Sequence, residues 1–155
     1  MRFFADEMLG KLARWLRALG ADVSYEVNWD DEKILALAKR QERIVLTRDH
    51  KLFKRLQNIH FPSLFIDHDH LEDQMRQFFR HYPGLKTLDR LLTRCMECNE
   101  MLESVAKEKV KDQVWPFVYE TQDQFSYCKR CDRVYWRATH VNKIVQRLEE
   151  LVKES

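Results

Sequence analysis

Four short apolar runs, each followed by a segment with helical spacing, constrain the fold of this chain more than any other feature. The runs lie at residues 2–6, 21–27, 43–47 and 63–66, and the helical segments at 8–19, 31–40, 49–57 and 67–80. Strands that alternate with helices at this spacing run parallel and are joined by right-handed crossovers. The sequence therefore predicts an α/β fold with a small parallel sheet that carries helices on both faces.

The first of these helices, residues 8–19, has one apolar face and one basic face. Its apolar face is predicted to contain Met8, Leu9, Leu12, Trp15, Leu16 and Leu19. Arg14 and Arg17 then point away from the core, as helical periodicity requires. We interpret Arg17 as part of a solvated helix face.

Length and composition limit the class of protein. With 155 residues, of which 45% are hydrophobic, the chain can form one compact domain with a small appended module. No apolar stretch is long enough to cross a bilayer. The N-terminal MRFFADEM carries an acidic pair where a signal peptide needs apolar residues. We therefore expect a cytoplasmic protein with no membrane partner, whose net charge of +2 leaves the question of nucleic acid open.

The residue composition and pattern of the sequence change after residue 80. Residues 81–94 form a connecting segment in which Pro83 and Gly84 mark a break, and a short helix is expected after them. Residues 95–155 contain the aromatic and β-branched stretches VWPFVYE, FSYC and VYW, for which we expect strands. A helix is predicted at residues 141–154.

All four cysteines lie in this second part, as two CxxC pairs. Cys95 and Cys98 form the first pair, and Cys128 and Cys131 form the second. In an intracellular chain, paired CxxC motifs favour a metal over disulfides, and four thiolates complete a tetrahedral zinc site. Because four thiolates leave no open position for a substrate, we expect the zinc to be structural, as in a zinc ribbon, and to be needed for folding.

Acidic residues follow each predicted strand. Asp6 closes the first strand, Asp31 begins the helix after the second, Asp49 follows the third, and Asp67 and Asp69 follow the fourth. Ligands bind outside the carboxyl ends of parallel strands, so these side chains should share one edge of the sheet. Such a cluster repels itself unless cations neutralise it, and Mg²⁺ and Mn²⁺ prefer oxygen ligands. Phosphodiester cleavage is chemistry that such ions support.

Each acid also has a simpler explanation. Asp31 and Asp49 could be helix N-caps, and Asp67 and Asp69 could lie in a solvated turn. Their coincidence at one sheet edge carries the metal-site hypothesis.

Basic residues near these acids are candidates for binding phosphate. Arg48 stands beside Asp49, where a guanidinium could hold a phosphate, and Arg14 and Lys51 are further candidates. In the second part, Arg130 is a candidate RNA contact beside the second CxxC pair. It lies among Lys129, Arg133, Arg137 and the aromatic residues Tyr127, Tyr135 and Trp136. Arginines interleaved with aromatic rings suit single-stranded RNA, although the aromatic rings could instead pack inside the protein.

Longer phrases of the sequence resemble a known family. FADEMLGKLARWLRALGADV, DDEKILALA and RIVLTRDHKLFKR are similar to the PIN-like ribonuclease domain of the family named after the C-terminal domain of Mut-seven exonucleases. CMECNEML, FSYCKRC and VYWRATH are similar to the zinc ribbon that follows it there. The resemblance implies a PIN-like domain at 1–80, a connecting segment at 81–94, and a zinc ribbon with a C-terminal helix at 95–155.

The resemblance also implies an activity and its residues. It implies a Mg- or Mn-dependent ribonuclease with Asp6, Asp31 and Asp49 in the acidic site; Asp67 is the fourth acid by position, with Asp69 close behind. One departure concerns the last motif, where Ala138-Thr139 precede His140 and family members often have Gly-Ser. His140 itself is a spare zinc ligand or a contact at a helix start.

Two other functions remain as alternatives. One is a non-catalytic module of the same fold that binds RNA, a protein partner or a second copy of itself. The other is a phosphoacceptor receiver-like domain, with Asp49 as the acceptor. The second is disfavoured because SLFIDHDH supplies no hydroxyl group at the end of the fourth strand. The identity of the RNA, and whether cleavage is internal or terminal, are open.

Overall fold

A four-stranded parallel sheet organises the N-terminal part of the protein. The computed structural model describes residues 1–137 and 143–154. The strands are β1 (Arg2–Ala5), β2 (Asp22–Tyr25), β3 (Ile44–Thr47) and β4 (Ser63–Phe65). They pair in the order β2-β1-β3-β4, all parallel. The predicted parallel α/β fold is therefore confirmed for this part.

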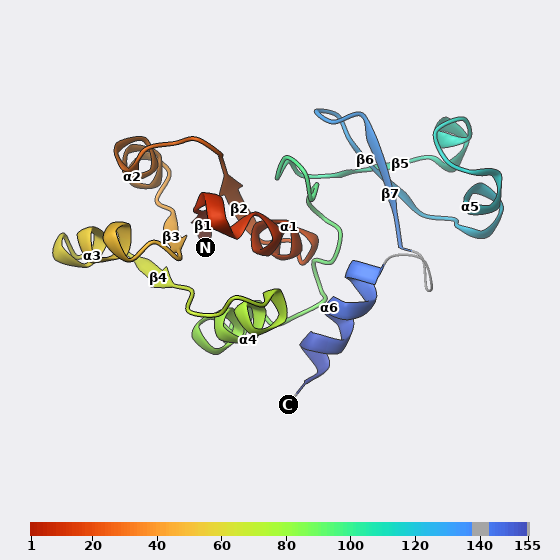
Figure 1. Ribbon diagram of the computed structural model, residues 1–155. Coiled ribbons are helices and arrows are strands. Elements are labelled where there is room, and N and C mark those ends of the chain that lie inside the picture. Colours follow the sequence, from red (N-terminus) through yellow and green to blue (C-terminus); the bar gives the residue numbers. More distant parts are fainter. Residues whose placement is uncertain (138–142, 155) are drawn as a thin grey trace.

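Helices cover both faces of the sheet, as predicted (Figure 1). They are η1 (Glu7–Leu9), α1 (Gly10–Ala18), α2 (Asp31–Arg40), α3 (His50–Asn58) and α4 (Leu71–His81). Successive residues of a strand point to opposite faces, so Phe3 packs in the core beneath α1 and α4, whereas Phe4 packs beneath α2 and α3. Both rings are fully buried. This explains why β1 is a continuous apolar run rather than an alternating one.

Helix α1 differs from its prediction at two positions. Met8 precedes the α-helix, lies in the 3-10 turn η1, and is 64% exposed rather than part of the core. Arg17, predicted to be solvated, is only 5% exposed. Its guanidinium reaches carbonyl groups of β2 and of the first CxxC segment, which spacing within the helix cannot reveal.

The connecting segment wraps around the end of α1. The 3-10 turn η2 (Pro83–Leu85) includes the predicted break, but residues 86–94 form turns rather than the expected short helix. The amide of Leu92 donates to the carbonyl of Ala18 at 2.7 Å. Gly20 has a φ of +88°, and a Cβ there would lie 2.5 Å from the Arg90 carbonyl oxygen. Glycine is therefore required for this close approach.

The C-terminal part contains a three-stranded antiparallel sheet and two helices. The strands are β5 (Glu103–Val105), β6 (Phe125–Cys128) and β7 (Arg133–Trp136), and the other elements are η3 (Lys107–Val110), α5 (Pro116–Thr121) and α6 (Lys143–Lys153). FSYC and VYW are strands, as predicted. The prediction of a strand at VWPFVYE is wrong, because this stretch contains most of α5. Pro116 lies in the first turn of α5, where proline favours the start of a helix.

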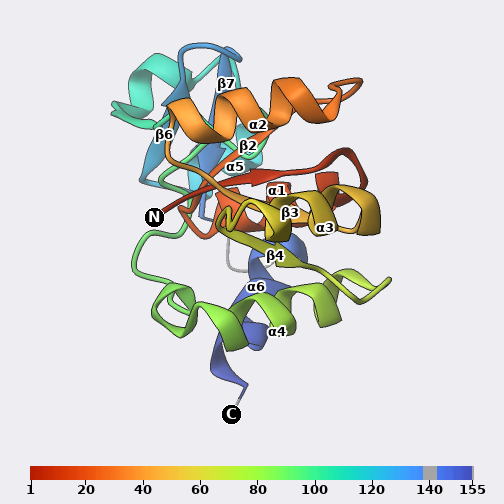
Figure 2. The ribbon, with the colours of Figure 1, turned by 90° about the vertical axis from the view of Figure 1, so that its left-hand side faces the viewer.

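Helix α6 returns to the N-terminal part and packs beside α1 and α4 (Figures 1 and 2). Val145, Leu148 and Leu151 join the same buried cluster as Phe3 and Leu12. Arg147 forms an ion pair with Glu72, and Arg76 with Glu154. The two parts thus share a core, and the predicted boundaries at residues 80 and 95 stay a prediction.

Two further observations complete the fold. Within the part of the chain that the structure describes, no helix is long and apolar enough to cross a membrane. His140, the Ala138-Thr139 pair before it, and the first two residues of the predicted helix at 141–154 lie outside the described residues.

Candidate functional site

Three of the predicted acids lie where parallel strands end. Asp6 directly follows β1, Asp49 lies two residues after β3 at the N-cap of α3, and Asp31 is the first residue of α2. The three side chains therefore come from three strand–helix junctions at the carboxyl edge of the sheet. This is the edge at which open α/β sheets bind their ligands.

A buried threonine holds two of these junctions together. The Thr47 hydroxyl donates to Asp6 Oδ2 at 2.9 Å and accepts from the Asp49 backbone N–H at 3.0 Å. Thr47 is fully buried, so this bridge is shielded from water. The threonine ends the RIVLT run, yet its role is not visible in the sequence, because a strand-end threonine fits a strand equally well without a partner.

Asp6 and Asp49 also cap the turns that follow them. Asp6 Oδ1 accepts from the Glu7 backbone N–H at 2.7 Å, and Asp49 Oδ1 accepts from the Lys51 and Leu52 N–H groups at 2.8 and 3.1 Å. The cap interpretation of Asp49 thus describes one of its oxygens. Among the described residues, Asp49 Oδ2 has no hydrogen-bond partner, so it can bind a cation without loss of the cap.

Asp31 is not the cap of its helix. The neighbouring Asp30 caps α2, because its Oδ1 accepts from the Lys33 backbone N–H at 2.9 Å. The pKa of Asp31 is raised by burial and then by the negative charges of Asp49 and Asp6. The carboxylate of Asp31 therefore has no capping role, and its pKa responds to the charges of the other two acids.

The fourth acid is not resolved between the two candidates. Asp67 is exposed, and its backbone N–H donates to Gln77 Oε1 at 3.0 Å. Asp69 Oδ1 instead accepts from Arg48 Nη2 at 2.5 Å, and this hydrogen bond holds the pKa of Asp69 below its ordinary value. The choice between Asp67 and Asp69 stays a prediction.

The predicted phosphate-binding residues have different surroundings. Arg48 lies against Asp69, and Lys51 is exposed in the first turn of α3. Arg14 forms an ion pair with Glu97 of the first CxxC segment at 3.0 Å, and Arg130 pairs more loosely with Glu100 at 3.8 Å.

Acids neutralise the other basic residues of the second CxxC region. Lys129 pairs with Glu103, Arg133 with Glu97, and Arg137 with Glu149. The aromatic rings also have partners inside the protein. Tyr127 bonds Asp132, Tyr135 is buried against Cys95, and Trp136 lies near Phe125.

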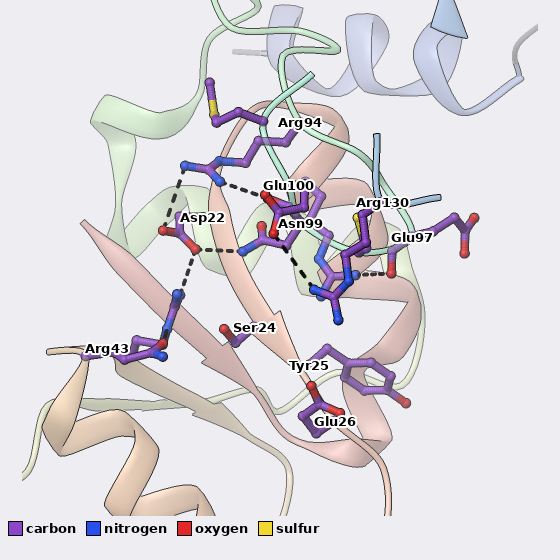
Figure 3. A pocket seen from close by; sticks show the side chains of 14 residues that line it. Asp22, Ser24, Tyr25, Glu26, Arg43, Arg94, Glu97, Asn99, Glu100 and Arg130 are labelled. Atoms are coloured by element: carbon purple, nitrogen blue, oxygen red, sulfur yellow. Dashed lines mark hydrogen bonds and ion pairs between the residues drawn. The ribbon is translucent and has the colours of Figure 1, made fainter. Parts of the chain in front are cut away.

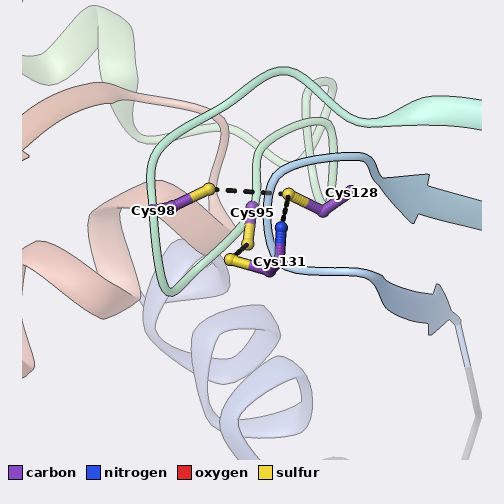
Figure 4. A group of neighbouring side chains, drawn as sticks. All are labelled: Cys95, Cys98, Cys128 and Cys131. Carbon is purple, nitrogen blue, oxygen red and sulfur yellow. Dashed lines mark hydrogen bonds between the residues drawn. The ribbon is translucent and has the colours of Figure 1, made fainter.

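The four cysteines converge on one point (Figure 4). Their sulfur atoms all lie within 4.8 Å of one another, with Cys98 and Cys128 at 3.5 Å and Cys95 and Cys131 at 3.8 Å. A tetrahedral zinc site with Zn–S bonds of about 2.3 Å has S–S edges of about 3.8 Å, so the arrangement fits zinc. Within residues 1–137 and 143–154, the four cysteines are the one group of three or more possible metal ligands whose ligand atoms lie this close together.

A buried tyrosine supports this cluster. The Tyr135 hydroxyl and Cys95 Sγ lie 3.1 Å apart. Hydrogen bonds to ligating atoms orient them and tune their affinity for metal. Tyr135, proposed from the sequence as an RNA or packing residue, therefore contacts the cysteine site.

A polar groove of about 560 Å³ lies between β2 and the first CxxC segment (Figure 3). At its centre, Asp22 accepts hydrogen bonds from Arg43 at 2.7 Å and from Asn99 Nδ2 at 2.8 Å. Asn99 Oδ1 also accepts from the Val23 backbone N–H at 3.0 Å. Sequence reasoning missed this groove; its one local signal was Asp22, an acidic residue at the start of β2.

Comparisons with known proteins identify the family of the chain. The family model described as Mut7-C RNAse domain matches residues 1–148. A human protein named exonuclease mut-7 homolog is 31% identical over 118 residues, which cover 74% of this chain and 14% of that protein. The chain therefore spans a small part of this relative. No solved structure gave a significant match.

Proposed function

Because the chain belongs to the Mut7-C RNAse domain family, we propose that it is a ribonuclease that depends on Mg²⁺ or Mn²⁺ and carries a structural zinc ion. The observation that carries the proposal is the position of Asp6, Asp31 and Asp49 at three strand–helix junctions of the carboxyl edge of the sheet. The name of the human relative, an exonuclease homolog, supports nuclease chemistry. The PIN-like classification of the sheet domain is part of the same proposal.

The donor set of this site suits a hard divalent cation. All three side chains offer carboxylate oxygens. Burial raises the pKa of Asp31 first, and the charges of Asp49 and Asp6 raise it further; a bound cation would relieve this repulsion. Mg²⁺ retains several of its waters, so the carboxylates need not close tightly around it. When bound, such an ion would activate water and stabilise the leaving oxygen in phosphodiester hydrolysis.

The residues of the chain have distinct roles in this mechanism. Thr47 keeps Asp6 and Asp49 in position through its two hydrogen bonds, and the caps formed by Oδ1 of both acids fix their rotamers. Arg48 holds the substrate phosphate, which must displace Asp69 from the guanidinium. Lys51 adds positive charge in the first turn of α3.

Zinc is proposed for the four cysteines. It would fasten the first CxxC segment to the second, and it would thereby hold the region that carries Arg130, our candidate RNA contact. Loss of the ion should loosen this region, because the metal–sulfur bonds that join the two segments contribute free energy of folding. We expect one equivalent of zinc per chain by elemental analysis; less than about half an equivalent would contradict this part of the proposal.

The alternative is a non-catalytic module of the same fold that binds RNA or a protein. The capping hydrogen bonds of Asp6 and Asp49 are compatible with this alternative, because they give both acids a structural role without catalysis. It differs in one measurable respect, since it requires no divalent ion at the sheet edge.

Cleavage of a labelled RNA with Mn²⁺ or Mg²⁺ tests the proposal. The variants are Asp6→Asn and Asp49→Asn, which keep side-chain size and the capping oxygen. The control is Asp89→Asn, an exposed acid of the connecting segment. We expect both site variants to lose cleavage by at least about a hundredfold, with thermal melting near that of the wild type and the control fully active. Full activity in both site variants would refute the mechanism.

A further inference from the structure

The groove between β2 and the first CxxC segment is lined by charged side chains of both signs. Four of its lining residues are arginines: Arg17, Arg43, Arg94 and Arg130. Three more arginines, Arg2, Arg14 and Arg133, form ion pairs with acids of the lining. The lining also contains four carboxylates, Asp22, Glu26, Glu97 and Glu100. A guanidinium that pairs with a carboxylate can bind a phosphate in its place.

The groove is connected to the acidic edge of the sheet by a short series of hydrogen bonds. Asp6 Oδ1 accepts from the Glu7 backbone N–H, and the Glu7 carbonyl accepts from the Tyr25 hydroxyl at 2.8 Å. Tyr25 lines the groove. A Cβ on Gly10 would lie 2.8 Å from the Tyr25 hydroxyl, so the absence of a side chain there leaves room for the ring. A ligand in the groove would therefore lead toward the three acids.

An extended peptide is a poor fit for the same groove. β2 is an edge strand, and a peptide that adds to an edge strand must bond its free backbone groups. At Val23 both groups are already taken, because Asn99 accepts from the N–H and Arg17 donates to the carbonyl at 2.8 Å. A sugar–phosphate backbone does not need these groups and instead needs cations.

Arg130 is the cation of the groove that is most available to a ligand. Its side chain is 69% exposed and its ion pair with Glu100 is long, at 3.8 Å. Figure 3 shows it beside Glu100, facing the same hollow as Tyr25 and Glu26. Arg17 and Arg43, in contrast, are buried and bonded to backbone carbonyls. Exchange of a carboxylate for a phosphate at Arg130 therefore requires no change in the core.

We propose that this groove binds the backbone of a single RNA strand beside the bond to be cleaved, with Arg130 as a phosphate contact. The inference rests on the proposed ribonuclease function and specifies where its substrate lies. In this proposal the first CxxC segment, besides holding two of the cysteines, forms one wall of the path that the RNA follows.

Equilibrium binding to a fluorescent oligouridylate of about 12 nucleotides tests the inference. Fluorescence anisotropy is measured at several salt concentrations, on the zinc-loaded full chain without added Mg²⁺ or Mn²⁺. The variants are Arg130→Ala and Glu100→Gln. The matched control is Arg137→Ala, because Arg137 is 62% exposed, also pairs with one glutamate, and does not line the groove.

We expect Arg130→Ala to weaken binding about tenfold and to reduce the slope of log K against log salt by about 0.7, which is the share of one phosphate contact on a single strand. Glu100→Gln should strengthen binding, because it releases Arg130. Arg137→Ala should change the affinity less than about twofold. Equal losses in Arg130→Ala and Arg137→Ala, or no loss in either, would overturn the inference.

Hydrolysis of bis(p-nitrophenyl) phosphate with Mn²⁺ separates this inference from the proposed function. This small diester does not extend into the groove, so its hydrolysis by the wild-type protein reports on the acidic edge of the sheet alone. If no form of the protein hydrolyses it or RNA while the binding pattern holds, the groove assignment stands and the ribonuclease proposal fails. If hydrolysis occurs and the binding pattern is absent, the groove assignment fails alone.

Discussion

Replacement of the buried Arg17 tests whether the first CxxC segment is anchored to the sheet domain by one side chain. Arg17 donates to the carbonyls of Val23 at 2.8 Å, Met96 at 3.2 Å and Glu97 at 3.0 Å. Arg17→Met keeps the length of the side chain and removes all three hydrogen bonds. Each bond from a charged donor contributes about 1.5–3 kcal/mol. Burial lowers the pKa of Arg17, which shows that its charge is costly to bury, and part of the loss is thereby recovered.

We expect a net loss of about 3 kcal/mol in the free energy of unfolding, measured by urea denaturation of the zinc-loaded protein. The control is Arg14→Met, one turn earlier on the same helix. Arg14 is 44% exposed and forms a single ion pair with Glu97, so its loss should cost between about 0 and 1 kcal/mol. Arg17→Met should also release zinc faster to a chelator, because Met96 and Glu97 lie between two ligating cysteines. A loss no larger than that of Arg14→Met would refute the anchoring argument.

Three further predictions concern charge and metal. Without divalent ions, Asp31→Asn should stabilise the protein at neutral pH. The pKa of Asp31 is higher in the folded than in the unfolded chain, so ionisation of Asp31 destabilises the fold as the pH rises. Denaturant melts should show that the gain vanishes below about pH 3.8, where Asp31 is protonated in both states. Burial raises the pKa of Asp22, but the hydrogen bonds from Arg43 and Asn99 and the charges of Arg43 and Arg94 together outweigh it, so the pKa is lowered. Asp22→Asn should therefore destabilise the protein at pH 7, and the difference from the wild type in melts should shrink as the pH falls through this lowered pKa. Tyr135→Phe should weaken zinc binding about tenfold in chelator competition, because it removes the contact with Cys95 Sγ.

Each of these predictions has a clear contrary result. A pH-independent effect of Asp31→Asn would mean that the pKa of Asp31 is not raised in the folded protein. Equal acid sensitivity of Asp22→Asn and the wild type would show that Asp22 is not held in its charged form. Unchanged zinc affinity in Tyr135→Phe would leave the tyrosine as ordinary packing.

The parts of the structure that sequence reasoning predicted depend on short-range patterns. The parallel strands follow from apolar runs alternating with helical segments, and α1 and α3 begin within a few residues of the acids predicted at the strand ends. The convergence of Cys95, Cys98, Cys128 and Cys131 follows from two CxxC turns, each of which fixes its own pair. In these cases the residues that decide the structure are neighbours in the chain or repeat at a fixed period.

The parts that the sequence did not predict depend on partners far along the chain. Helical spacing places Arg17 on the polar side of α1. Two of the three carbonyls that it bonds nevertheless belong to Met96 and Glu97, which lie 79 and 80 positions later in the chain. VWPFVYE has strand-forming residues, but the proline at the first helical turn favours a helix over their propensity. The hydrogen bond from Thr47 to Asp6 joins positions that are 41 residues apart, and no local pattern encodes such a contact.

This division has a consequence for the proposed site. Local sequence places each acid at its own strand–helix junction, but the pairing of β2, β1 and β3 decides that these junctions are neighbours, and Thr47 ties two of them together. Likewise, the CxxC turn places Asn99, but its bonds to Val23 and Asp22 decide that this segment forms a wall beside the sheet. The acids that would hold the ion can therefore be recognised from sequence, whereas the path that would bring RNA to them becomes visible only once the C-terminal part is docked on β2.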